Sequence, residues 1–220
     1  MGKLKLLFFL WGMFYSLLGI TASEISLKNW IGEDSSGKFK MTKVDDCLDI
    51  VSPDGLTLWY DECLTGNYEI SYRIKVVMEG GKYDRLSDMN CFWGAKDLKY
   101  PDNIYARKDW RAGIFKNYNT LNLFYVGYGG NENKTTRFRE YHSEFYGIDE
   151  NKIKPLVKEY TDEAHLLKPN RWYEVVITVT DGKTTFAVDG EELFCHSISR
   201  GQGDGYFPGS ILLLEQKKRT

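Results

Sequence analysis

The sequence predicts an all-β fold, a two-sheet antiparallel sandwich of the jelly-roll type. Three observations support this prediction. Apolar and polar residues alternate over several segments of the chain. Turns that contain Asp and Gly separate these segments, as expected of antiparallel strands. No stretch of ten or more residues carries a helical period.

The longest predicted strand runs from residue 68 to residue 78. Its even-numbered residues are all apolar or aromatic, whereas residues 69, 71, 73 and 75 are polar, which indicates one buried face. Residues 172–180 alternate in the same way. Tight turns at Asp181-Gly182 and Asp189-Gly190 then predict that strands follow at 184–188 and 191–194, because Gly after Asp accepts the positive φ of such turns.

Other segments complete the predicted sandwich. Residues 48–51 and 56–60 read as a hairpin joined by the Ser-Pro-Asp-Gly turn at 52–55, and residues 121–127 read as a further strand. Residues 148–167 are rich in charges and contain Pro155, so we expect a long loop with one short helix there.

The N-terminus has the pattern of an export signal. Lys3 and Lys5 precede an apolar run at 6–20, and the small residues of 21–23 follow it. The apolar run is about 15 residues long, shorter than the roughly 20 that span a membrane. We therefore expect residues 1–22 to be a signal peptide and residues 23–220 to be a single domain. This predicts a periplasmic, cell-surface or secreted protein without a stable membrane span after cleavage.

Composition argues against some classes of partner. The 29 basic and 31 acidic residues give a net charge of −2, which does not favour binding to nucleic acid. Aromatic residues make up 15 % of the chain, and this high share suits both a β-core and a surface on which sugar rings stack. We expect no metal or other cofactor, because no metal-ligand spacing of His or Cys occurs.

Four cysteines are spread along the chain, at Cys47, Cys63, Cys91 and Cys195. Export would permit disulfides, and four cysteines allow three pairings. In the predicted hairpin the residue opposite Cys47 lies near position 60, which makes a direct bond to Cys63 doubtful. The favoured expectation is buried free thiols.

The centre of the chain, residues 84–141, differs from the rest in mixing aromatic rings with amide and guanidinium groups. Rings stack on the apolar face of a sugar, while Asn and Arg bond its hydroxyls or carboxylates. Arg137 and Arg139 are two residues apart, so they share one face of a strand. The candidate substrate-binding residues are Asn90, Trp93, Tyr118, Tyr125, Asn131, Asn133, Arg139 and Tyr141.

The motifs leave one enzymatic route open. The paired acids Glu-x-Asp-x-x-Glu of laminarinase-type jelly rolls are absent, as is Gly-x-Ser-x-Gly. Elimination from a uronate remains, in which a cation or amide neutralises the carboxylate and a Tyr or His removes the C5 proton. Tyr128 or His142 would be the base, and Arg137 or Asn131 the neutralising group.

Three functional hypotheses therefore stand together. The first is an exported enzyme that cleaves a complex polysaccharide, most plausibly a lyase. The second is a non-catalytic glycan-binding module, which needs the same aromatic and polar surface but no proton-transferring group. The third is a structural subunit of a surface assembly. The expected partner in the first two is a polysaccharide or oligosaccharide.

Three motifs carry a resemblance to a known family. They are Ser-Asp-x-Asn-x-Phe-Trp at 87–93, the run from Tyr125 to Arg139, and Leu-Leu-x-Pro-Asn at 166–170. Over roughly residues 45–207 the chain resembles a bacterial family, number 6250 among the domains of unknown function. This resemblance implies a concanavalin A-like sandwich, export, and a setting of glycan degradation.

The C-terminal end departs from that pattern. Such families continue after Gly-Tyr-Phe with two further strands, the last of which is aromatic and returns to the sheet. Here residues 208–220 contain an apolar run at Ile211–Leu214 without alternation and then a basic end. We therefore expect residues 210–220 to be an atypical tail and the sandwich to lack its closing strand, which would leave an unpaired edge.

Overall fold

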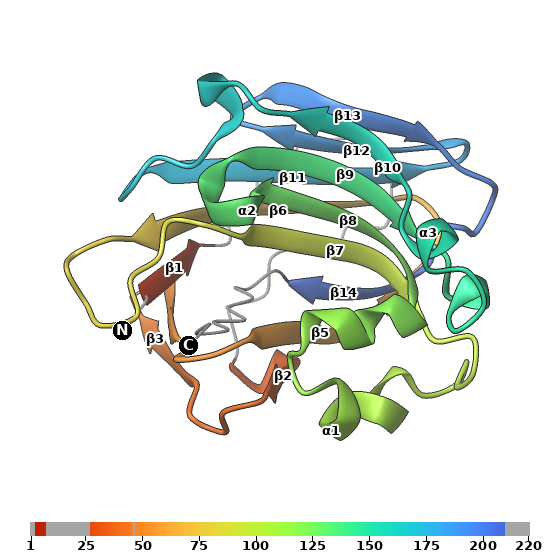
Figure 1. Cartoon of the computed structure of the whole chain (residues 1–220), viewed down its shortest axis with the longest axis horizontal. Coiled ribbons are helices and arrows are strands. Elements are labelled where there is room, and N and C mark those ends of the chain that lie inside the picture. Colours follow the sequence, from red (N-terminus) through yellow and green to blue (C-terminus); the bar gives the residue numbers. More distant parts are fainter. Residues whose placement is uncertain (1–2, 8–26, 46, 210–220) are drawn as a thin grey trace.

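A computed structural model describes residues 3–7, 27–45 and 47–209 of the chain, and these residues form two packed antiparallel sheets (Figure 1). The first sheet has the strand order β13 (Glu191–Ser197), β12 (Lys183–Val188), β11 (Trp172–Thr180), β6 (Tyr68–Val77), β1 (Lys3–Leu7), β4 (Cys47–Val51) and β3 (Lys40–Val44). The second has the order β10 (Leu156–Tyr160), β9 (Thr135–Tyr141), β8 (Asn122–Gly129), β7 (Met89–Lys96), β14 (Gly205–Gly209), β5 (Leu56–Leu64) and β2 (Trp30–Asp34).

Helices are short and lie in the connections between strands. The four-residue helices are α1 (Lys108–Arg111), α2 (Gly130–Asn133) and α3 (Glu150–Ile153). The 3-10 turns are η1 (Leu27–Asn29), η2 (Ile104–Arg107), η3 (Phe115–Thr120), η4 (Ser143–Phe145) and η5 (Glu163–His165). The predicted all-β sandwich is confirmed.

The predicted meander of β11, β12 and β13 is also confirmed. Val175 pairs with Val188 across the first hairpin, and Phe186 pairs with Phe194 across the second. The turn glycines Gly182 and Gly190 have φ of 92° and 83°. Glycine adopts such positive φ values at little energetic cost because it has no Cβ.

Two expectations about strand pairing are wrong. Residues 48–51 and 56–60 do not form a hairpin, because β4 joins the first sheet and β5 joins the second. The turn at 52–55 therefore carries the chain from one sheet to the other. The segment 148–167 contains the expected short helix, α3, but it also contains the edge strand β10, which pairs with β9. Four of the five residues of β10 are exposed, so it shows no alternation in sequence.

The main core lies between the two sheets. Alternate residues of β6 and β11, such as Ile74 and Val175, meet inward-facing rings of β7 to β9. Trp93 is fully buried there and stacks on Phe138 and Phe186 with ring centroids 5.9 and 6.0 Å apart. Burial of such side chains is the main stabilising term of the sandwich.

A second apolar cluster covers the other face of the second sheet. It contains Trp59, Phe92, Tyr118 and Tyr125, and the residues from η2 to η3 pack on it. A buried ion pair joins this insertion to β2, since Arg111 contacts Glu33 at 2.6 Å with both side chains fully buried. The Tyr118 hydroxyl donates to the same carboxylate.

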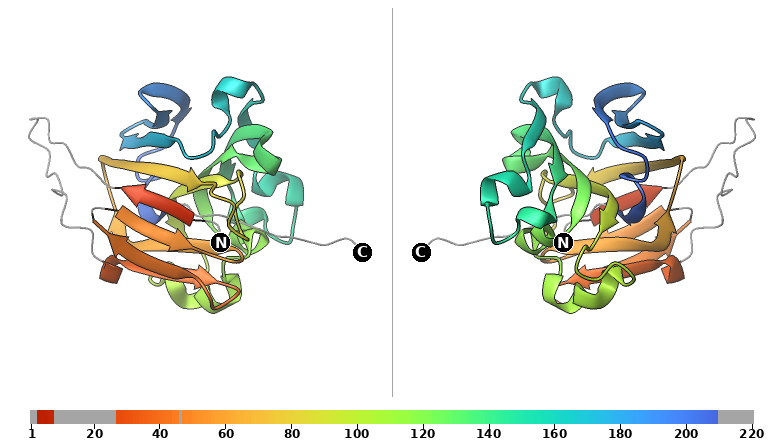
Figure 2. Two further views of the ribbon diagram at one scale, coloured as in Figure 1. Left: turned by 90° about the vertical axis from the view of Figure 1, so that its left-hand side faces the viewer. Right: turned by 90° about the vertical axis from the view of Figure 1, so that its right-hand side faces the viewer.

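The first sheet is continuous because β1 lies between β4 and β6. Lys3 to Leu7 pair with Val51 to Cys47 on one side and with Val77 to Arg73 on the other. Figure 2 shows β1 in red between the gold β6 and the orange β4. Thus five residues of the predicted signal peptide form a strand here, whereas residues 8–22 and the predicted tail at 210–220 lie outside the described residues.

The cysteines only partly match the expectation of buried thiols. Cys91 is a free thiol in the core, where burial raises its pKa to about 12. Cys63 and Cys195 are free but exposed. Cys195 lies on the edge strand β13 and Cys63 near the end of β5, whereas Cys91 lies on the central strand β7.

Candidate functional site

Strands β8 and β9 separate two kinds of residue onto their two faces. The even-numbered residues Phe124, Val126 and Phe138 point into the core between the sheets. The odd-numbered residues point away from it, to the outer face of the second sheet, where Tyr125 and Tyr141 join the second cluster. This is the ordinary period of two in a strand, and it brings the candidate residues at 125, 137, 139 and 141 to one side.

These outward residues line a pocket of about 300 Å³, here called the outer-face pocket. Its lining residues are Asp88, Phe115, Tyr125, Gly127, Gly130, Asn131, Thr135, Arg137, Arg139, Tyr141 and Lys154. Strands β8 and β9 supply most of them, and η3 and the segment after α3 close one side. The pocket thus combines three aromatic rings with three cationic side chains.

The two arginines of the pocket are held differently. The Arg137 guanidinium forms an ion pair with Glu159 of the neighbouring strand β10. Arg139 instead donates from Nη1 to the backbone carbonyl of Lys154, at a distance of 2.5 Å. Because this partner is a neutral carbonyl, Arg139 keeps more of its capacity to bind an anion than Arg137 does.

Lys154 is the third cation of the pocket. Its Nζ lies 5.0 Å from the ring centroid of Phe115 and 5.7 Å from that of Tyr141, within the range of cation–π attraction. Burial lowers the pKa of Lys154 below its ordinary value, and the nearby Arg139 charge lowers it further. The lysine is therefore a cation that releases its proton more readily than a free lysine.

Two tyrosines meet at the inner end of the pocket. The Tyr125 hydroxyl donates to Oδ1 of Asn90, at 3.0 Å, and Asn90 is itself buried on β7. A Cβ at Gly127 would collide with this same hydroxyl, so glycine is needed beside it. The Tyr141 hydroxyl is buried without a hydrogen-bond partner, although the ring lines the pocket. Burial raises the pKa of both tyrosines, which keeps them protonated.

A turn of left-handed helix forms the rim at α2. Asn131, Glu132 and Asn133 all have φ between 55° and 58°, in the region that L-residues disfavour. The turn exposes Asn131 at the pocket, and Asn133 holds it in place. Asn133 donates from Nδ2 to the Leu167 carbonyl and accepts from the Leu167 N–H, at 3.0 and 2.8 Å. Backbone strain of this kind is found most often at functional sites.

Asp88 is the one carboxylate among the described lining residues of this pocket. It contacts Arg85 at 2.8 Å and accepts from Ser87 Oγ at 2.7 Å. Burial raises the pKa of Asp88, against the opposing effects of Ser87 and Arg85. The rest of the pocket is cationic or neutral, so the site suits a ligand with negative charge.

Some predicted site residues lie elsewhere. Trp93 and Tyr128 point into the core between the sheets, where Trp93 donates to Thr184 Oγ1 at 2.9 Å and Tyr128 packs on Tyr173. Both occupy the inward-facing positions of their strands, so neither can contact a ligand of the outer-face pocket. The assignment of Tyr128 as a base and of Trp93 as a stacking platform is therefore not supported at this site.

Three further candidates have other surroundings. Tyr118 is fully buried and bonds Glu33, as described above. His142 follows β9 and lies near two carboxylates, with Nδ1 3.5 Å from Glu144 and Nε2 3.8 Å from Glu140. It is not among the lining residues of the pocket. Asn133 is engaged with the backbone of Leu167, so its amide supports the turn instead of facing a ligand.

Sequence reasoning missed Lys154. It follows α3 in a segment that we expected to be a loop, and it reaches the pocket only because β10 folds back against β9. No local pattern marks it, since a lysine between Ile153 and Pro155 resembles any surface lysine. Phe115 belongs to the central segment but was not singled out.

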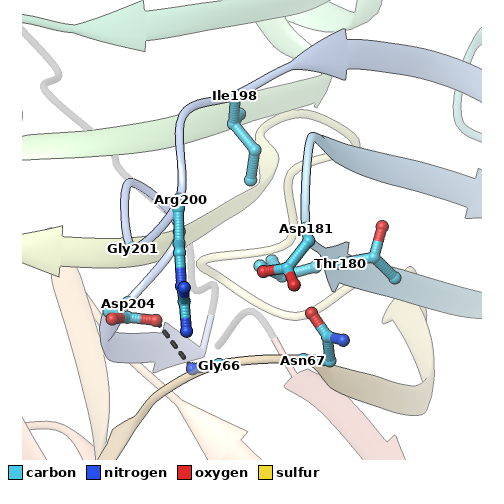
Figure 3. A pocket seen from close by; sticks show the side chains of 10 residues that line it. Gly66, Asn67, Thr180, Asp181, Ile198, Arg200, Gly201 and Asp204 are labelled. Carbon is cyan, nitrogen blue, oxygen red and sulfur yellow. Dashed lines mark hydrogen bonds between the residues drawn. The ribbon is translucent and has the colours of Figure 1, made fainter.

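A second pocket, of about 350 Å³, lies at one end of the sandwich (Figure 3). Its loops follow β5, β11 and β13. Figure 3 shows Arg200 extending past Asp204 toward Gly66, with Asn67 and Asp181 opposite. Asp204 accepts from the Gly66 N–H at 2.7 Å. This pocket has polar groups but no aromatic ring, so it lacks a surface for stacking a sugar.

Two further features, a metal-binding cluster and a membrane-spanning helix, are absent from the described part of the chain. No group of three or more His, Cys, Asp or Glu side chains there is arranged to hold a metal ion. None of the helices in residues 27–45 and 47–209 is long and apolar enough to cross a membrane.

The two packed antiparallel sheets define a β-sandwich protein of galectin-like architecture. A protein of unknown function with a galectin-like fold from Bacillus subtilis is similar over 82 % of each chain, with a TM-score of 0.56 and 14 % identity. At this identity the likeness shows the fold. The chain belongs to the family described as Domain of unknown function (DUF6250), whose model matches residues 50–212.

Other solved structures are more distant. The carbohydrate-binding module CBM66 from Bacillus subtilis is 10 % identical, with a TM-score of 0.44, over 81 % of this chain and 86 % of that one. A native glycosidic hydrolase is also 10 % identical, with a TM-score of 0.45, over 83 % of this chain and 76 % of that one. No curated protein matches the chain.

Proposed function

We propose that the protein binds an acidic carbohydrate polymer through the outer-face pocket. The observation that carries this proposal is the position of Arg139 and Lys154 beside the rings of Phe115 and Tyr141. A uronate sugar presents a carboxylate on one side and an apolar ring face on another, and this pocket offers a partner to both. The mild cationic surplus is local, since the whole chain carries a net charge of −2.

Binding assays test this proposal. Isothermal calorimetry with oligosaccharides of polygalacturonate, alginate and hyaluronan should show binding to at least one, and a neutral glucan should not bind. Arg139→Ala should weaken binding about tenfold to a hundredfold, because it removes a charge-assisted hydrogen bond worth about 1.5–3 kcal/mol. Added salt should also weaken binding, since the attraction is between charges.

A matched control separates this site from general surface charge. Arg171 is an exposed arginine that pairs with Asp189 at 2.7 Å and lies outside the pocket. Arg171→Ala should leave the affinity within about twofold. Equal losses for Arg139→Ala and Arg171→Ala would contradict the assignment of the pocket, and failure to bind any acidic probe would contradict the proposed function.

Cleavage by elimination is the second candidate function, and the composition of the pocket favours it over hydrolysis. Hydrolysis of a glycosidic bond uses a pair of carboxylates, about 5 Å apart in retaining enzymes. Among the described lining residues, Asp88 is the sole carboxylate, and it already has Arg85 and Ser87 as partners. Elimination needs a neutralised uronate carboxylate and a base, which suits a cationic pocket.

The cellular setting forms part of the proposal. An exported protein would meet such a polymer in the periplasm, at the cell surface or outside the cell. The pattern of residues 1–22 supports export, and the acidic-glycan site gives an exported protein an available ligand. A structural subunit of a surface assembly, the remaining hypothesis, has no feature of the described residues in its favour.

A further inference from the structure

We propose that Lys154 and Tyr141 form the proton-transferring pair of a uronate elimination in the outer-face pocket, with Arg139 as the carboxylate-neutralising group. This inference rests on the acidic-glycan site proposed above. It names residues that sequence reasoning did not assign to these roles, because Lys154 was not a candidate and Tyr141 was considered only a binding residue.

The position of Lys154 suits a base. Its backbone carbonyl accepts from Arg139, which fixes the backbone at the point where the side chain enters the pocket. Its amine lies against Phe115 and Tyr141. The charged groups that act on it are Arg139 on β9, Lys116 on η3 and Glu150 on α3.

The surroundings of Lys154 make its ammonium release a proton more readily than that of a free lysine. Burial and the charge of Arg139 lower its pKa, Lys116 acts in the same direction, and only Glu150 opposes them. Lowering the pKa of a lysine is the usual way to obtain an amine that accepts a proton near neutral pH. The geometry and the chemistry thus point to the same role.

The position of Tyr141 suits an acid. Its ring lines the pocket, its side chain is 1 % exposed, and its hydroxyl has no partner in the described structure. A buried hydroxyl without a partner is costly, so such groups in native proteins call for a functional explanation. A glycosidic oxygen bound in the pocket would supply the missing acceptor.

The proton balance of the reaction closes within the pocket. The neutral Lys154 amine takes the C5 proton of the uronate, whose carboxylate is held by Arg139. A double bond forms between C4 and C5 as the C4–O4 bond breaks, and the Tyr141 hydroxyl gives its proton to O4. The ammonium of Lys154 then returns a proton to the Tyr141 oxygen, so both residues regain their starting forms. No oxidant, reductant or metal is needed.

The residues first considered as bases do not fill these roles. Tyr128 points into the core between the sheets, and His142 is not part of the pocket lining. A base must come within hydrogen-bond reach of the proton it removes. Lys154 lines the pocket and has a lowered pKa, so it is the lining residue that suits the role of base.

Two conservative substitutions test the pair. Lys154→Arg keeps the positive charge but removes a group that can lose its proton at ordinary pH. Tyr141→Phe removes only the unpartnered hydroxyl, so it should not impair folding. Product formation from polygalacturonate, alginate and hyaluronan is followed by the ultraviolet absorbance of the unsaturated uronate, and binding is followed by calorimetry.

The expected result separates binding from turnover. Each substitution should lower kcat by about 10²–10⁴-fold, the usual contribution of a general acid or base, while the dissociation constant changes by less than about threefold. For the unaltered protein, kcat should rise with pH as Lys154 loses its proton. Lys152→Arg and Tyr100→Phe, at exposed positions outside the pocket, are the matched controls and should behave as the unaltered protein does.

Failures of the two proposals are distinguishable. Absence of binding to every acidic probe overturns the acidic-glycan site itself, and this inference with it. Binding without unsaturated product overturns the elimination and leaves a binding module. Unsaturated product that Lys154→Arg or Tyr141→Phe forms at the ordinary rate overturns the assignment of that residue.

Discussion

At the scale of single residues, Arg111 and Glu33 show what holds the pocket's supporting layer in place. Both side chains are fully removed from solvent. Arg111 also donates to the Ile104 carbonyl at 2.7 Å, and its guanidinium lies over the ring of Trp59. The pair therefore ties the insertion that carries Phe115 to β2 and β5. Loss of one partner of a buried ion pair strongly destabilises the fold, because the other charge is left buried and uncompensated.

Removal of one partner should therefore be costly. Arg111→Met should lower the free energy of unfolding by about 3–5 kcal/mol, the usual loss when a buried ion pair is broken. Urea denaturation followed by circular dichroism measures it. Arg171→Met breaks an exposed pair and should change stability by less than about 1 kcal/mol. A similar small effect for both substitutions would show that the buried pair is not a stabilising contact.

The period of two explains which site residues could be predicted. Arg137 and Arg139 were predicted to share one strand face because they are two residues apart, and both line the outer-face pocket. The same period, read along β7 and β8, assigns Trp93 and Tyr128 to the opposite face. Aromatic and polar character alone did not distinguish a core residue from a ligand contact, since both roles use the same residue types.

At the scale of elements, the left-handed turn α2 is a strained connection between β8 and β9. Three consecutive residues other than glycine adopt positive φ there. For each of them this conformation is about 1–2 kcal/mol less stable than a right-handed one. Contacts made by Asn133 and Leu167 offset part of this cost. The contact of Glu132 is weaker, since its exposed side chain pairs with the exposed Lys134 at 3.0 Å.

Relief of this strain should be measurable. Glu132→Gly should raise the free energy of unfolding by about 0.5–1 kcal/mol. The backbone strain energy that glycine relieves in the folded state exceeds the conformational entropy that glycine adds to the unfolded chain. Lys134→Gly breaks the same surface contact at a residue with φ of −109° and should lower stability instead. Chemical denaturation of the two variants gives the comparison. Equal effects in both would indicate that the turn carries no strain.

Elements with one buried face could be predicted from the sequence, whereas those without one could not. The strands at 68–77 and 172–180 alternate, and their bounds were found to within a residue. Strand β10 is exposed along most of its length, so its pattern resembles a loop. The turn at 52–55 gave no indication of whether its strands pair or separate, because a tight turn suits a hairpin and a crossing between sheets alike.

At the scale of the whole molecule, β1 links the two halves of the first sheet. Without it, β4 and β3 would have no neighbour in common with β6. The same residues, 3–7, lie within the predicted signal peptide. Export with cleavage and completion of this sheet by β1 therefore exclude each other in one molecule.

The consequence for stability can be measured directly. A chain that begins at Ser23 should unfold at a lower urea concentration than the full chain, because β4 and β6 lose the backbone hydrogen bonds that β1 makes on both sides. A chain lacking only residues 1–2 is the control and should match the full chain. Intact mass of the exported protein would tell which form is present. Equal unfolding midpoints for the Ser23 chain and the full chain would mean that β1 is dispensable.

The alternation in β8 and β9 also bears on how such a protein can change over evolutionary time. Its odd-numbered positions line the outer-face pocket, and its even-numbered positions hold the two sheets together. Substitutions at positions 137 and 139, which are partly exposed, are thus largely independent of those at 124, 126 and 138. One pair of strands can diversify in ligand preference while its fold is inherited unchanged.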